Sequence, residues 1–147
     1  MKRTFSGMPH AWLVMMKAAQ ALGRYGARSI REAGLGDSDF RVLEALLHKG
    51  PLPVNTIGPK VDLTPGSISV AVERLHQKGL LSRTASTADR RVRIVRLTTK
   101  GRERIVPVFR QHADAMKEVF GALNAKELAA LEAALKKVGK RAEERMF

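Results

Sequence analysis

The chain has 147 residues, 44% of them hydrophobic, which is enough for one domain with its own core. It contains no cysteine, and this excludes disulfides, thiolate metal sites and cysteine redox switches. Its apolar runs are far shorter than the roughly 20 residues that span a bilayer, and no signal-peptide pattern is present, so we expect a cytoplasmic protein. The formal net charge of +13 favours an anionic partner, either nucleic acid or a negatively charged membrane surface.

The positive charge is concentrated in the middle of the chain. Residues 60–104 hold eleven basic and four acidic side chains, a net charge of +7 within 45 residues. All other residues together carry +6. Residues 60–104 are therefore the segment where we expect an anionic partner to bind.

Three helices are predicted in the first part of the chain. Residues 9–33 place apolar side chains at helical spacing, and a glycine-rich stretch ends this helix. A second helix begins at Asp37 or Ser38, either of which suits an N-cap. Residues 54–62 predict a third helix, distorted or very short because Pro59 removes a backbone donor.

A fourth helix has the clearest start in the sequence. Thr64 suits the N-cap, and Pro65 suits the first helical position, where the missing N–H costs nothing. Apolar residues at helical spacing continue through Leu75, and Gly79 ends the helix.

The hydrophobic period then changes from that of a helix to that of a strand. Residues 80–84 predict one strand, residues 85–90 a turn, and residues 91–97 a second strand. The second strand alternates basic and branched residues, so that one face is apolar and the other is cationic.

Two helices complete the chain. Thr98 or Thr99 caps a long helix that continues to about residue 121, with a kink expected at Pro107. Asn124 begins the last helix with capping-box spacing. The predicted fold is therefore mainly α, with six helices and a small β-hairpin between the fourth and the fifth.

Two short helices joined by a tight turn and followed by a basic hairpin are typical of a winged helix-turn-helix. The first turns of a helix in the major groove of B-DNA face the base edges, and a helix N-terminus attracts phosphate. For Arg74 a second interpretation stays open, an ion pair with a carboxylate such as Asp62. The residues of the fourth helix that we expect to contact DNA are Thr64, Pro65, Gly66, Ser67, Ser69, Val70 and Arg74.

The hairpin, or wing, supplies a second contact with DNA. Arg90, at or near its tip, is the candidate for insertion into a narrow minor groove, where the potential is strongly negative. Asp89 repels DNA, and we expect it to hold a neighbouring arginine such as Arg91 and so to shape the wing. Lys60 and Arg83 are candidates for phosphate contacts.

Three segments resemble the MarR family of winged helix-turn-helix regulators. The run 89–101 resembles the family's wing signature, an Asp-Arg-Arg followed by alternating apolar residues, Leu-Thr and a glycine. The segment 63–80 resembles its recognition helix, and 39–43 resembles the start of its second helix. The resemblance extends over residues 10–145.

The resemblance implies an intertwined homodimer that binds double-stranded DNA. Residues 9–33 and 102–147 would form a helical dimerisation lobe, and residues 35–101 the DNA-binding lobe. It further implies a repressor at a pseudo-palindromic operator, released in many members by a small lipophilic or phenolic ligand. The apolar stripe that we expect in the dimer interface is formed by Leu128, Leu131 and Leu135.

Other functions find less support in the sequence. The four histidines show no metal-ligand spacing, and no phosphate-binding glycine loop or nucleophile elbow is present. We therefore expect no metal, no cofactor, no membrane partner and no enzymatic activity, while a non-specific architectural or RNA-binding role stays open. One set of residues is a candidate effector pocket, although the same spacing also suits core or dimer interface: Trp12, Met15, Met16, Phe40, Leu43 and Phe109.

Overall fold

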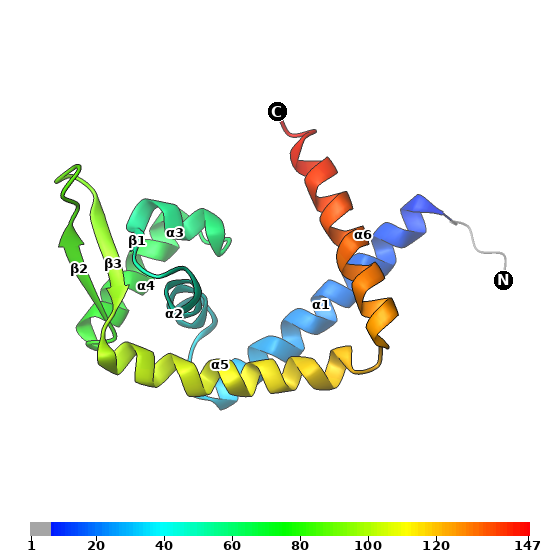
Figure 1. Cartoon of the computed structure of the whole chain (residues 1–147), viewed down its shortest axis with the longest axis horizontal. Helices are drawn as coiled ribbons and strands as arrows, with labels where there is room; N and C mark the ends of the chain where they lie inside the picture. Colours follow the sequence, from blue (N-terminus) through cyan, green and yellow to red (C-terminus); the bar gives the residue numbers. More distant parts are fainter. Residues whose placement is uncertain (1–6) are drawn as a thin grey trace. The chain divides into compact units, whose positions relative to one another are not determined.

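The protein is represented by a computed structural model that describes residues 7–147 (Figure 1). Over this range the chain forms six helices and three short strands. No helix among these residues is both long and apolar enough to cross a bilayer. The elements in chain order are α1 (Met8–Glu32), α2 (Asp37–Lys49), β1 (Leu52–Pro53), α3 (Val54–Lys60), α4 (Pro65–Gln77), β2 (Leu81–Ala85), β3 (Arg93–Leu97), α5 (Thr99–Phe120) and α6 (Ala125–Glu143).

The helix starts follow local capping chemistry. Thr64 is the N-cap of α4, since its Oγ1 accepts a hydrogen bond from the Ser67 N–H at 3.2 Å. Asn124 and Glu127 form the predicted capping box of α6. The prediction for α2 was wrong by one position, because the N-cap is Gly36 and Asp37 is already the first helical residue. The short helix expected around Pro59 is confirmed, with α3 only seven residues long.

The sheet has three strands, and the sequence predicted only two. β3 is the central strand and pairs antiparallel with both β2 and β1. Its pairing with β1 places Leu52 opposite Val95 and Pro53 opposite Ile94. Two residues are too few to show an alternating pattern, and a proline is tolerated here because β1 lies at the edge of the sheet. The base of the wing is therefore anchored to the segment that precedes α3.

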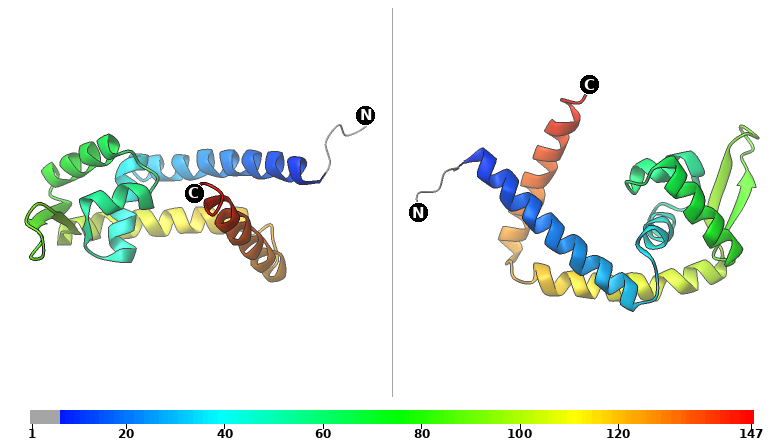
Figure 2. Two further views of the ribbon diagram at one scale, coloured as in Figure 1. Left: turned by 90° about the horizontal axis from the view of Figure 1, so that it is seen from above. Right: turned by 180° about the vertical axis from the view of Figure 1, so that it is seen from behind.

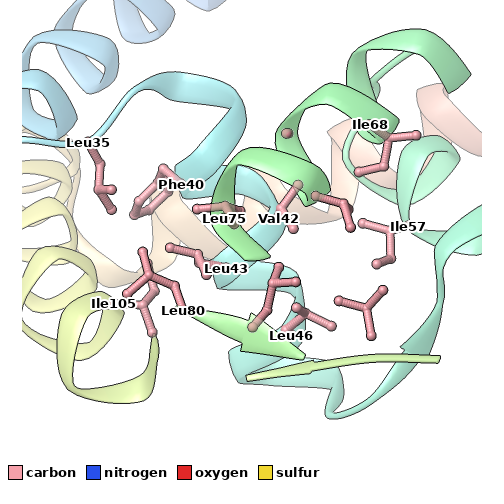
Figure 3. Packing of buried hydrophobic residues seen from close by; sticks show 14 of the residues in the cluster. Leu35, Phe40, Val42, Leu43, Leu46, Ile57, Ile68, Leu75, Leu80 and Ile105 are labelled. Atoms are coloured by element: carbon pink, nitrogen blue, oxygen red, sulfur yellow. The ribbon is translucent and has the colours of Figure 1, made fainter. Parts of the chain in front are cut away.

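The core surrounds α2 (Figure 3). One face of α2 packs against α3, α4, the sheet and the start of α5, so the elements that carry the predicted DNA contacts share one hydrophobic cluster. Close packing of this kind holds the elements in fixed relative positions. The largest fully buried side chains are Val42, Leu43, Leu46, Ile57, Leu75, Leu81, Val95 and Ile105.

The chain divides into two compact units, one ending at His112 and the other beginning at Ala113. The first unit contains every residue that the sequence assigns to DNA binding. The second contains α6, which has no buried residue.

Candidate nucleic-acid interface

The start of α4 presents the predicted DNA-contacting residues to solvent. Ser67 and Ser69 are exposed, and the exposed fraction of Val70 is 60%. The exposed stretch also includes Thr64, Pro65 and Gly66. The inward face of the same helix carries Ile68, Ala71, Val72 and Leu75, all buried. An exposed valine beside serines gives this surface a hydroxyl-bearing and apolar character, with few charges.

A groove joins the recognition helix to the wing. Its volume is about 530 Å³, and it lies between α3, the first half of α4 and the strands β2 and β3. Ser69 of α4 borders this groove together with Arg83, Arg91 and Arg93. Arg93 was not among the predicted DNA contacts, although its place in the alternating basic pattern of the strand was visible in the sequence. The groove therefore brings part of the predicted recognition helix and part of the predicted wing onto one face.

The turn of the wing is ordered by Asp89. Its carboxylate accepts hydrogen bonds from the backbone N–H of Arg91 at 3.0 Å and from the Arg91 guanidinium at 3.2 Å. These bonds, the side-chain bond first, lower the pKa of Asp89 below its ordinary value. The predicted pairing of Asp89 with Arg91 is confirmed. Arg91 remains 91% exposed while it is paired, so its cation is both oriented and accessible.

Two of the predicted DNA-contacting cations have no side-chain hydrogen bond or ion pair within residues 7–147. Arg90 lies on the turn of the wing and is exposed. Lys60 is exposed at the last position of α3, and α4 and β2 separate it along the chain from the turn of the wing. Both side chains are free to approach phosphate.

Arg74 has an internal partner. Its Nε donates to both carboxylate oxygens of Asp39, at 3.0 and 3.2 Å, and its Nη2 donates to the same carboxylate and to Ser38 Oγ at 3.3 Å. The hydrogen bond with Asp39 raises the pKa of Arg74. The ion pair anticipated as the second interpretation of Arg74 is present, with Asp39 in place of Asp62 as the carboxylate.

Arg83 is also paired. Its Nη1 lies 2.9 Å from Glu73 Oε2, and its Nη2 lies 3.3 Å from His76 Nδ1. The sequence did not identify Asp39 and Glu73 as functional candidates. Each pairs with an arginine on another element of the fold, and no local sequence pattern marks such a pair. Glu73 is the single acidic residue of α4, and this was the signal available in the sequence.

The six residues of the candidate effector pocket lie in different environments in the single chain. Phe40 and Leu43 are buried in the core, whereas the exposed fractions of Trp12 and Met16 on α1 are 59% and 36%. Phe109 is partly buried against the core, and its ring contacts that of His48 edge to face at 4.7 Å. Met15 is half-buried on α1. The six residues are thus divided between core and surface.

The apolar stripe of α6 is largely uncovered in the single chain. Leu128 and Leu131 are half-buried, and Leu135 is 45% exposed. Val138 on the same helix is 56% exposed. The stripe is therefore available for contact with a partner.

Known proteins resemble this chain in sequence and in fold. The MarR family pattern matches residues 35–92. The HTH-type transcriptional regulator MhqR of Bacillus subtilis is 37% identical over 128 residues, which cover 87% of this chain and 88% of MhqR. A mutant of MarR from E. coli, solved in complex with operator DNA, is 25% identical and covers 89% of this chain and 94% of its own, with a TM-score of 0.75.

A further solved structure concerns regulation. It is that of BpsR from Bordetella bronchiseptica, whose DNA binding is regulated by 6-hydroxynicotinic acid. It is 25% identical to this chain, covers 88% of it and 98% of its own chain, and gives a TM-score of 0.77. The identity to MhqR over most of both chains, together with the fold, shows that this chain belongs to the MarR family of winged helix-turn-helix, DNA-binding transcriptional regulators.

Proposed function

We propose that the protein binds double-stranded DNA as a homodimer at a pseudo-palindromic operator and represses transcription by covering a promoter. The observation that carries the proposal is the groove shared by α3, α4 and the wing, because it sets a helix start beside an arginine-bearing β-ribbon within one compact unit. A helix of this kind fits the major groove, while an arginine on a ribbon reaches the neighbouring minor groove.

The exposed residues support distinct roles in this complex. Ser67 and Ser69 would donate hydrogen bonds to phosphates or base edges, and Val70 would contact a thymine methyl group. Arg90 would enter the minor groove. Lys60 would contact phosphate and contribute to a steep dependence of affinity on salt.

The dimer would form through residues 9–33 and 102–147, leaving residues 35–101 as the DNA-binding lobe. The stripe of Leu128, Leu131 and Leu135 supports this division, because α6 buries no residue by itself. Apolar side chains on α1 are exposed as well, including Met8, Trp12 and Leu13. Exposed apolar surface of this extent is typical of an interface.

We further propose that a small lipophilic or phenolic ligand releases the protein from DNA. The regulation of BpsR by 6-hydroxynicotinic acid supports this for a protein of similar fold. A ligand acts in this way when it favours a dimer whose two recognition helices no longer match half-sites one turn apart. The exposed Trp12 and Met16 would contribute to a site completed by the second protomer.

The experiment is selection of bound duplexes from a random pool, followed by gel-shift assays on the selected sequence and on random duplexes with excess competitor. We expect a palindromic consensus that outcompetes random DNA. Equal retardation of every duplex would favour a non-specific architectural role, and no retardation at low salt would contradict DNA binding altogether. Transcription in vitro from a template carrying the selected site tests repression, and addition of aromatic acids and phenols to the complex tests release.

A further inference from the structure

Two consecutive residues of α4 tie the recognition helix to different neighbours. Glu73 pairs with Arg83 of β2 at 2.9 Å, and Arg74 pairs with Asp39 of α2. Side chains of consecutive residues point about 100° apart around a helix, so the two restraints act in different directions. The right-hand view of Figure 2 shows α4 between α2 and the wing, and both neighbours contact it.

The Asp39–Arg74 pair is built around a buried carboxylate. The exposed fraction of the Asp39 side chain is 6%, and a buried carboxylate needs cationic or hydrogen-bonding partners. Arg74 supplies two of its nitrogens, and Lys78 Nζ lies 4.0 Å away. The donors that Arg74 directs at Asp39 are therefore occupied and are not free for DNA.

The Glu73–Arg83 pair is more exposed to solvent. Gln77 Nε2 donates to Glu73 Oε1 at 3.0 Å, so Glu73 is held from two sides. The exposed fractions are 34% for Arg83 and 48% for Glu73, and ion pairs of such exposure add little to stability. Their main effect is on geometry, because the pair joins the second half of α4 to β2, the first strand of the wing.

We infer that Asp39 and Glu73 are positioning residues for operator recognition, and that Arg74 and Arg83 act through them rather than by contacting phosphate. The Glu73–Arg83 pair sets the rotation of α4 relative to the wing, and the Asp39–Arg74 pair sets its rotation relative to α2. Together they determine which base edges face Ser69 and Val70. This inference rests on the proposed function. It predicts that loss of either pair lowers discrimination between sequences while the number of phosphate contacts stays the same.

The test is fluorescence anisotropy of the full-length protein with the selected operator and with a duplex changed at one recognised base pair, repeated over a range of salt concentrations. For Arg74→Gln and Arg83→Gln we expect discrimination to fall about tenfold, the value of one well-placed base contact. The slope of log affinity against log salt should stay unchanged, whereas loss of a phosphate contact lowers it by about 0.9.

A charge reversal makes the test specific to the pair. Glu73→Arg and Arg83→Glu should each lower discrimination, and the double variant should restore it, because the pair forms again at the original net charge. Arg28→Gln is the matched control: it removes one arginine from the exposed Arg28–Glu32 pair of α1 and should change neither quantity. Far-UV circular dichroism identifies variants that fail to fold. If Arg74→Gln does not fold, the Glu73 and Arg83 variants still test the inference.

Three results would overturn the inference. A salt slope lowered by about 0.9 in Arg74→Gln or Arg83→Gln, with discrimination retained, would make these arginines direct phosphate contacts. A folded double-reversal variant without restored discrimination would show that the Glu73–Arg83 pair does not position the helix. A wild-type protein that binds no duplex would refute the proposed function itself, and the inference would fall with it.

Discussion

Among the glycines that the structure describes, Gly101 is the one at which an added methyl group comes closest to another atom, so alanine there should destabilise the fold most. It is buried in the first turn of α5, and its N–H donates to Thr98 Oγ1 at 3.0 Å. A Cβ at this position would lie 1.8 Å from the carbonyl oxygen of Leu80 and 2.8 Å from its carbonyl carbon. Leu80 precedes β2 directly, and its carbonyl also accepts the Thr98 N–H at 3.2 Å. The Gly101→Ala variant therefore forces α5 away from the base of the wing.

The cost follows from these distances. Non-bonded heavy atoms need about 3.5 Å, so the two backbones must separate by more than about 1.5 Å. That movement breaks the bond between Thr98 and Leu80, at about 1 kcal/mol. Overpacking against a backbone group that cannot rotate away adds about 3 kcal/mol, the upper end of its usual range. Replacing glycine by alanine within a helix stabilises the fold by about 1 kcal/mol, so the net decrease in the free energy of unfolding is about 3 kcal/mol.

Urea denaturation of Gly101→Ala and wild type measures this difference in the free energy of unfolding. Gly23→Ala is the matched control, because the same change within α1 places a Cβ with no atom within 4 Å beyond its chain neighbours and the backbone of its own helix turn. We expect this control to be as stable as wild type or more stable, by up to about 1 kcal/mol. A Gly101→Ala variant with wild-type stability would show that the close approach of α5 to Leu80 is not a constraint on the fold.

Four further predictions address the interface, the dimer and the helix start. Arg90→Ala should weaken operator binding by roughly 1–3 kcal/mol in anisotropy titrations without changing thermal unfolding, and unchanged affinity would refute its minor-groove role. Leu131→Asp should produce a monomer in light scattering, because it places a charge in the apolar stripe of α6; a variant that stays dimeric would place the interface elsewhere. Pro65→Ala should be nearly neutral in chemical denaturation, whereas Thr64→Ala should lose about 1 kcal/mol with its N-cap bond, and the reverse order would contradict the assigned helix start. The pKa of Asp89 is lowered in the folded state, so its contribution to the stability of the wing is fully present above the ordinary aspartate pKa of about 3.9 and is lost as the pH falls through the folded-state value. Carboxyl NMR should show Asp89 titrating below the ordinary range, and titration at the ordinary value would contradict the Asp89–Arg91 contact.

The sequence by itself determined the features that depend on neighbours within about four residues along the chain. Thr64 and Asn124 mark helix starts through hydrogen bonds to residues three positions ahead. The change from helical to alternating spacing located the wing, and the Asp89–Arg91 pair could be anticipated because its members are two residues apart. These local patterns were sufficient for the winged helix-turn-helix topology and for the DNA-binding function that the family shares.

Only the tertiary structure decided which distant residues meet. Leu52 pairs with Val95, and Arg74 finds its carboxylate 35 residues away in Asp39. Spacing along a helix indicates which residues share a face, but it does not tell which element that face will contact. For this reason helical spacing alone could not separate Phe40, which the fold buries in the core, from Trp12, which stays exposed in the single chain. Contacts between elements depend on how the whole chain packs, and no local pattern encodes them.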